Sequence, residues 1–170
     1  MLLIDYLLLL VLAVSIYTDI REQKIYNIVL FPAFLLAWAF HFRTGGGTGL
    51  LTSLHGAGLG LGLFLIPYVA GGLGAGDVKL LALVGACKGS AFVFTAFFLT
   101  ALLGGIIALA LLIYRGELLK VWVRLKDALI VCIFSSFKVW NLGSLKDAGS
   151  VSFPYGVAIA LGSMITYVVM

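Results

Sequence analysis

The sequence predicts an all-α integral membrane protein with six transmembrane helices and one interfacial amphipathic helix. Of its 170 residues, 63% are hydrophobic and only 11% are charged, and the mean hydropathy is +1.20. Soluble domains carry about 25% charged residues. The apolar residues gather in runs separated by short polar connections, as in multi-pass membrane proteins. The length leaves no room for a substantial soluble domain, so residues 1–170 are expected to form one membrane-embedded domain.

The six predicted spans are apolar runs bounded by polar or glycine-rich connections. They cover about residues 2–18, 28–42, 50–70, 77–86, 91–114 and 153–169. The first span carries Asp5 where a signal peptide would have basic residues. No small-residue cleavage site follows it, so we expect this helix to be retained. A polar connection over 19–27 precedes the second span, which ends in a flexible glycine turn at 43–47.

The third and fourth predicted spans are unusual in composition and in length. The third carries Gly58, Gly60 and Gly62, which favour close approach of a neighbouring helix. The fourth has a predicted rise of ~15 Å, half of a ~30 Å hydrocarbon core. Either the loop 71–76 dips into the membrane or the bilayer is thin there. Non-helical backbone at that depth needs protein or water around it, so we expect Asp77 in a wet pocket.

The residues that follow the fifth span differ from the rest of the chain. A tight turn at 87–90 leads into that span. Beyond it, basic and apolar side chains interleave over 116–140, and the apolar stretch 128–137 is too short to span. This pattern predicts a cytoplasmic amphipathic helix lying on the membrane surface. The alternative is a tilted seventh span, which would move the C-terminus from the outside to the inside.

The distribution of positive charge predicts the orientation of the chain. Among its eleven Lys and Arg residues, only Arg43 and Lys88 fall on one side of the six-helix topology. The richer side is therefore expected to face the cytoplasm. The net charge of +4 follows from this bias, so we expect a lipid bilayer around the chain and no nucleic-acid partner. A nucleic-acid binder would cluster its basic side chains on one exposed face.

Asp19 and Asp77 are the candidate catalytic residues. Each lies at the edge of an apolar run, where a carboxylate costs ~2.5–3.5 kcal/mol on insertion scales and marks a functional site by default. The topology puts both on the cytoplasmic side, so they can meet. Two close carboxylates share a proton. The ionised one can activate water, and the protonated one can polarise a peptide carbonyl. The assignment of these two roles stays open.

Each candidate residue also has a structural interpretation. Asp77 at a helix start can simply be a cap, whereas Asp19 at a helix end opposes the macrodipole and caps poorly. Lys79 lies roughly 200° around the helix from Asp77. It either snorkels to lipid headgroups, which we favour, or meets an acidic group of a substrate. Tyr155, within the polar cluster 152–156, either anchors at the interface or lines the pocket.

Other chemistries are poorly supported by the sequence. Cys87 and Cys132 fall near opposite faces of the membrane and are not expected to pair. His41 and His55 form no zinc site of recognisable spacing with them. The segment 74–76 lacks the Gly-Lys-Ser/Thr ending of a phosphate loop. We therefore expect no metal and no cofactor.

Three motifs resemble those of a known family. Gly74-Ala75-Gly76-Asp77 resembles the GxGD motif of intramembrane aspartyl proteases. Together with Asp19, the following Ile25-Tyr26-Asn27, and Phe153-Pro154-Tyr155-Gly156, it resembles the type IV prepilin peptidases over nearly the whole chain. The resemblance implies that Asp19 and Asp77 are the catalytic pair. It also implies that Gly74 and Gly76 form the turn presenting Asp77. Supporting roles are implied for Asn27, Lys79, Pro154, Tyr155 and Gly156.

The resemblance also implies an activity. These peptidases of the inner (cytoplasmic) membrane remove the basic leader of prepilins or pseudopilins after a glycine, at the cytoplasmic face and without a cofactor. Association with pilus assembly machinery is a further expectation. Tyr26 departs from the family, which commonly has a proline there with a fixed φ. No Cys-x-x-Cys domain precedes the first helix, so we expect cleavage without N-methylation. Small peptidases of tight-adherence (Flp-type) systems share this form, and archaeal preflagellin peptidases are a nearby variant.

A non-enzymatic function is the competing hypothesis. A membrane scaffold or a proton-coupled carrier could also use intramembrane carboxylates. Transporters often contain inverted repeats, which this sequence does not display. A degenerate peptidase acting as a scaffold is harder to distinguish, but Asp19 and Asp77 are both retained.

Overall fold

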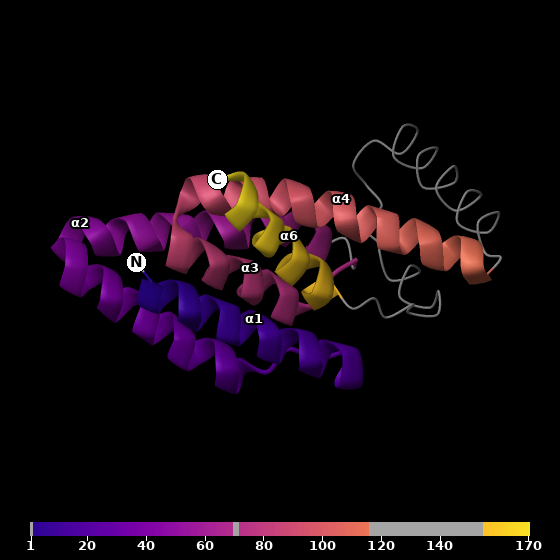
Figure 1. Cartoon of the computed structure of the whole chain (residues 1–170), viewed down its shortest axis with the longest axis horizontal. Coiled ribbons are helices and arrows are strands. Elements are labelled where there is room, and N and C mark those ends of the chain that lie inside the picture. Colours follow the sequence, from indigo (N-terminus) through magenta and orange to yellow (C-terminus); the bar gives the residue numbers. More distant parts are fainter. Residues whose placement is uncertain (1, 70–71, 116–154) are drawn as a thin grey trace, which may run out of the picture. The chain divides into compact units, whose positions relative to one another are not determined.

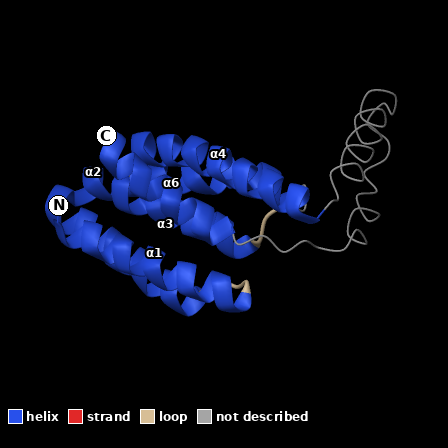
Figure 2. Ribbon diagram, turned by 45° about the vertical axis from the view of Figure 1, so that its right-hand side comes forward, coloured by secondary structure: helices blue, strands red, loops and turns tan. Residues whose placement is uncertain are grey.

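The computed structural model describes residues 2–69, 72–115 and 155–170. The amphipathic helix predicted over 116–140 lies outside these residues. The described residues form helices and no strand, which confirms the all-α prediction for this part of the chain (Figures 1 and 2). The helices are α1 (Leu2–Glu22), α2 (Asn27–Val69), α3 (Ala75–Lys88), α4 (Ser90–Arg115) and α6 (Tyr155–Val169).

The described residues belong to two compact units. Residues 2–104 and 155–170 form the first unit, and residues 105–115 belong to the second. The first unit holds four complete helices and the first part of α4. It contains every described candidate site residue.

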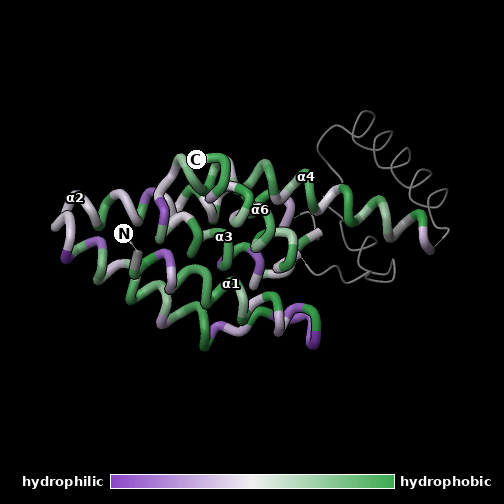
Figure 3. The backbone as a smooth tube through the Cα atoms, in the orientation of Figure 1, coloured by the Kyte–Doolittle hydropathy of each residue, from purple (hydrophilic) through white to green (hydrophobic). Residues whose placement is uncertain are grey.

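Three of the described helices are long and apolar enough to cross a bilayer. They cover Leu3–Glu22, Asn27–Val69 and Ser90–Ala110, and α6 is a shorter apolar helix. Figure 3 shows hydrophobic residues along all of them. Large apolar side chains such as Leu10, Phe31 and Leu102 are exposed, as expected of surfaces that meet lipid. The structure therefore supports a membrane protein, while six separate spans stay a prediction.

Helix α2 contains both the second and the third predicted span. Its 43 residues are interrupted at Gly46, whose φ of 57° and ψ of −143° lie outside the helical region. A positive φ of this kind is open to glycine at little cost. Figure 1 shows the chain doubling back here, so that the two arms of α2 diverge from this point. The predicted turn over 43–47 coincides with this reversal.

Helix α3 begins earlier and ends later than the predicted span 77–86. It has fourteen residues, about 21 Å at 1.5 Å per residue. The prediction of a loop through Gly76 was wrong, because capping at Gly74 starts the helix at Ala75. The predicted turn 87–90 shrinks to Gly89, which has a φ of 86° and donates its N–H to the Gly85 carbonyl at 2.8 Å.

Helix α1 also runs further than predicted. The expected end at Thr18 was wrong, because the helical hydrogen bonding continues until the Gln23 N–H donates to the Asp19 carbonyl at 3.0 Å. Gln23 then adopts a φ of 53° and ends the helix. Arg21 in the last turn complements the helix dipole. Asp19 consequently lies within a helical turn, with its side chain facing inward.

Helix α3 is the centre of the first unit and packs chiefly on α2. All its residues from Asp77 to Cys87 except Lys79 are buried. Gly56 of α2 and Gly85 of α3 are so close that a Cβ on either would overlap the backbone of the other. Gly60 meets α3 in the same way, as predicted. The same prediction was wrong for Gly58 and Gly62, where a Cβ would meet no other helix within 4 Å in the described part of the chain.

A polar cluster joins three helices at the end where the chain termini lie (Figure 1). Lys88 at the end of α3 forms an ion pair with Asp5 of α1, with 2.8 Å between Nζ and Oδ1. The Tyr167 hydroxyl of α6 donates to the same oxygen at 3.0 Å. The Lys88 ammonium also lies 4.3 Å from the centre of the Tyr167 ring. Through these contacts, the charges of Asp5 and Lys88 compensate each other at this end of the first unit.

We predict that Lys88→Met destabilises the protein by about 1–3 kcal/mol, because Asp5 then loses its charged partner while both side chains are largely buried. Thermal unfolding in detergent measures the loss. The double variant Asp5→Asn/Lys88→Met should recover most of it. A double variant no more stable than Lys88→Met alone would contradict the pairing.

Candidate active site

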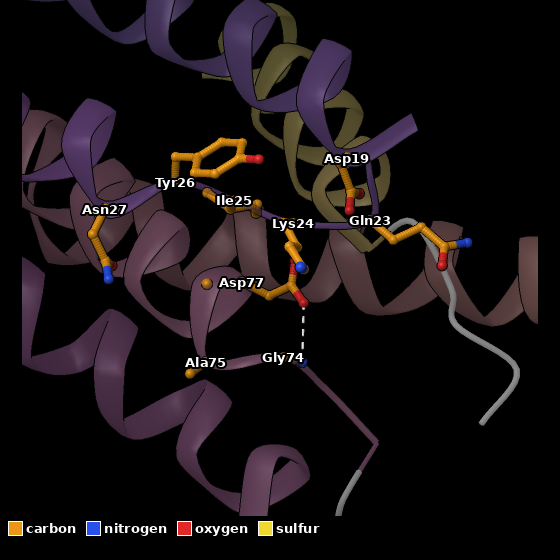
Figure 4. Close-up of a pocket in the computed structure, with 10 residues that line it drawn as sticks. Asp19, Gln23, Lys24, Ile25, Tyr26, Asn27, Gly74, Ala75 and Asp77 are labelled. Carbon is orange, nitrogen blue, oxygen red and sulfur yellow. Dashed lines mark hydrogen bonds between the residues drawn. The ribbon is translucent and has the colours of Figure 1, made fainter. Parts of the chain in front are cut away.

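Asp19 and Asp77 line one pocket of about 330 Å³ (Figure 4). Their side chains are only 4% and 8% exposed. The end of α1, the linker to α2 and the start of α3 supply the walls. The lining residues are Asp19, Gln23, Lys24, Ile25, Tyr26, Asn27, Gly74, Ala75, Gly76 and Asp77. The two aspartates predicted to meet therefore reach the same cavity, and the charge of Asp19 acts on the Asp77 carboxyl.

Asp77 is held by the turn that precedes it. Its Oδ2 accepts the Gly74 N–H at 3.1 Å (Figure 4), and its own N–H donates to the Gly74 carbonyl at 3.2 Å. A Cβ on Gly76 would lie 2.9 Å from the Cβ of Ile25. The two glycines therefore have different tasks: Gly74 caps the helix, and Gly76 lets the linker pack against it. Asp77 is both a helix cap and a pocket residue.

Asp19 is held by a different helix, α6. Its Oδ2 accepts the Gly156 N–H at 2.7 Å, and the Val157 backbone N–H also donates to its carboxylate. The positive end of the α6 dipole thus compensates for the unfavourable position of Asp19 at the end of α1. The sequence marked Gly156 only as a supporting residue. The feature of the sequence that could have indicated this contact was a glycine in the first turn of an apolar helix.

Lys79 and Asn27 contact each other near the starts of α3 and α2. The Lys79 Nζ donates to the Asn27 Oδ1 at 2.9 Å, and both side chains are exposed. This protein partner was not anticipated by either predicted role of Lys79. Asn27 itself lines the pocket, so the bond links one pocket wall to the helix that carries Asp77.

Tyr155 lies near the site, at the start of α6. It is half-buried, a Cβ on Gly104 of α4 would contact its ring, and it experiences the charge of Asp77. Tyr155 is not among the residues that line the pocket, so its two predicted roles, interfacial anchor and pocket residue, both stay predictions. Pro154, the neighbouring predicted residue, lies outside the described part of the chain.

Tyr26 replaces the proline expected between Ile25 and Asn27. Its carbonyl accepts the N–H groups of Val29 and Leu30 and so begins α2. Its hydroxyl donates to the Glu22 carboxylate, which raises the pKa of Tyr26 because that charge disfavours the phenolate. The linker is therefore fixed at both ends without a proline.

A comparison with protein families shows to which family the chain belongs. The sequence profile of the type IV leader peptidase family matches residues 6–109. This range covers more than half of the chain and includes Asp19 and Asp77. The chain belongs to the type IV leader peptidase family. Searches of curated proteins and of solved structures found no significant match.

Membership of the leader peptidase family confirms the predicted relationship and indicates a membrane-embedded peptidase. For a leader peptidase, a pocket with two buried carboxylates offers the groups that acid–base hydrolysis of a peptide needs. Among the described residues, no group of three or more His, Cys, Asp and Glu side chains is placed to hold a metal. The family match ends before α6, so the contact between Asp19 and Gly156 is known only from the tertiary structure.

Proposed function

We propose that the chain is an aspartic endopeptidase that removes the leader peptide of type IV (Flp-like) prepilins or pseudopilins. One observation carries this proposal: Asp19 and Asp77, far apart in the sequence of a leader peptidase family member, line a single pocket. The basic residues on the side of these aspartates favour a cytoplasmic active site in the inner membrane.

The reaction uses the two carboxyl groups in opposite protonation states. The ionised carboxylate takes a proton from water, whose oxygen then forms a bond to the scissile carbonyl carbon. The protonated carboxyl donates a hydrogen bond to the carbonyl oxygen and stabilises the developing negative charge. When the C–N bond breaks, the leaving amine takes up a proton from the pair. Two buried carboxyl groups in one pocket, with the charge of Asp19 acting on Asp77, suit this division of labour.

The pocket supports a peptide substrate that enters from the membrane surface. Its volume of about 330 Å³ is at the small end for ligand sites, so it suits a short stretch of extended peptide with small side chains. Cleavage after a glycine, as the family resemblance implies, agrees with this size. The exposed apolar side chains of the surrounding helices suit a substrate whose own hydrophobic helix stays in the bilayer.

Co-expression with an Flp-type prepilin tests the proposal. We expect a shorter product whose N-terminus, determined by sequencing and mass spectrometry, follows the glycine of the leader. An unmethylated amine is expected at this new N-terminus. A prepilin with valine in place of that glycine serves as the matched substrate and should stay uncut. No cleavage of the natural prepilin would favour the scaffold or the carrier.

A further inference from the structure

The first turn of α6 surrounds the carboxylate of Asp19 closely. The Gly156 N–H lies 2.7 Å from Oδ2 in a buried hydrogen bond, and the Val157 backbone donates a second. A Cβ on Gly156 would lie 2.8 Å from Oδ2 and 3.1 Å from Cγ of Asp19. Any side chain at position 156 would therefore displace either the carboxylate or the helix.

This environment differs from that of Asp77. Hydrogen bonds from backbone N–H groups and the positive end of a helix dipole both favour a charged carboxylate over a neutral carboxylic acid. Asp19 receives two such bonds, from Gly156 and Val157. Asp77 also lies at the positive end of a helix, in the first turn of α3, but it receives only one such bond, from the Gly74 N–H. The two aspartates are thus held unequally, although they line the same cavity.

We propose that Gly156 is a positioning residue, whose backbone holds Asp19 through Oδ2 as the ionised, water-activating member of the pair. The inference rests on the proposed peptidase function. With Oδ2 occupied by the Gly156 N–H, Oδ1 is the oxygen that takes the proton from water. Asp77 then supplies the proton to the substrate carbonyl. The match to the family profile, which ends at residue 109, does not include Gly156.

Other titratable groups face the same pocket and enter any pH dependence. Asp77 comes from α3, and Lys24 and Tyr26 come from the linker. Tyr155 of α6 is outside the pocket lining, but the charge of Asp77 acts on it. Glu22 accepts the Tyr26 hydroxyl at the rim. The test therefore compares variants that leave all of these residues in place.

The contact is tested first without reference to activity, by thermal unfolding of Gly156→Ala, Asp19→Ala and the double variant. Gly162→Ala is the matched control, because it makes the same change in α6 but would press on Thr100 of α4. The loss in Tm caused by Gly156→Ala should be clearly smaller when Asp19 is already alanine. The loss caused by Gly162→Ala should be the same in both backgrounds. Additive effects of Gly156→Ala and Asp19→Ala would overturn the inference.

The positioning role is tested next by the pH profile of prepilin cleavage. Gly156→Ala should lower kcat by up to ~100-fold and move the acidic limb of the profile up by about one pH unit. The direction follows because an Asp19 carboxylate without its N–H donors becomes protonated at higher pH. Gly162→Ala should change the cleavage rate by the same factor at every pH and leave the position of the acidic limb unchanged. If Gly156→Ala lowers the rate by the same factor at every pH and leaves the acidic limb in place, the positioning role is overturned.

A second pair of variants covers the case in which Gly156→Ala does not fold. Val157→Pro removes the second N–H donor and also disfavours the helical conformation of Gly156, whereas Val157→Ala keeps both donors in place. The acidic limb should move with Val157→Pro and stay with Val157→Ala; equal profiles would overturn the inference. If the wild type cleaves no prepilin, the proposed function fails and the catalytic part of the inference fails with it. The unfolding experiment would still decide whether the contact exists.

Discussion

Replacing either Asp19 or Asp77 by asparagine should lower the rate of prepilin cleavage by at least about a thousandfold. Asparagine has the shape of aspartate, and its carbonyl oxygen can still accept the N–H of Gly156 or Gly74 that each carboxylate binds. It cannot take up or release a proton at neutral pH. The variants therefore remove the acid–base function while keeping the packing, and single-turnover kinetics with purified enzyme measure the loss.

Asp5→Asn is the matched control for the aspartate variants. It makes the same chemical change in α1, but Asp5 lies in the cluster with Lys88 and Tyr167, away from the pocket. Its cleavage rate per folded molecule should stay within about twofold of the wild type, although its stability should fall. Cleavage that persists in either Asp19→Asn or Asp77→Asn would contradict the two-carboxylate mechanism.

Gly85→Val should destabilise the protein by about 3 kcal/mol or more. The side chain at position 85 would enter space occupied by the backbone of Gly56, and a backbone cannot move aside as a flexible side chain does. The helices α2 and α3 would have to separate at the centre of the first unit. We expect a lower Tm in detergent and less protein in the membrane. Cleavage should fall as well, because α3 carries Asp77.

Gly58→Val is the control for this prediction. Gly58 lies on α2, as Gly56 does, but a Cβ there would meet no described residue within 4 Å beyond the adjacent backbone of its own helix. Its effect on the free energy of unfolding should be within about 0.5 kcal/mol, as for a surface substitution. Equal Tm values for Gly85→Val and Gly58→Val would show that the close contact between α2 and α3 does not exist.

The candidate site could be predicted in part from the sequence. Asp19 and Asp77 stood out because charged residues beside apolar runs are rare, and the family resemblance implied that Gly74 and Gly76 form the turn presenting Asp77. The separate roles of Gly74 and Gly76 were not predictable. Gly76 makes room for Ile25, whereas Gly74 supplies an N–H to Asp77. Lys79 was expected to meet lipid headgroups or an acidic group of a substrate, and its bond to Asn27 was not anticipated. Such contacts depend on segments that are distant in the sequence.

Helix boundaries were predicted less accurately than the helices themselves. The end of α1 and the start of α3 were each misplaced, because the polar residues Asp19 and Asp77 were taken as the limits of the apolar runs. In the structure both belong to helical turns. Each carboxylate finds backbone N–H donors in the folded chain, at Gly156 and Gly74, which lowers the cost of placing it there.

The sequence by itself determined that the chain is helical and apolar, which side chains could carry chemistry, and to which family it belongs. These properties depend on residues that are close in the sequence. The hydropathy of a segment is the sum over its residues, and a motif is a short run of residues in a fixed order. Only the tertiary structure decided that Asp19 is held by α6, and that Gly56, Gly60 and Gly85 rather than Gly58 and Gly62 form the contact between helices. The physical reason is that such contacts depend on the rotation of each helix about its axis, which is set by packing against all its neighbours at once.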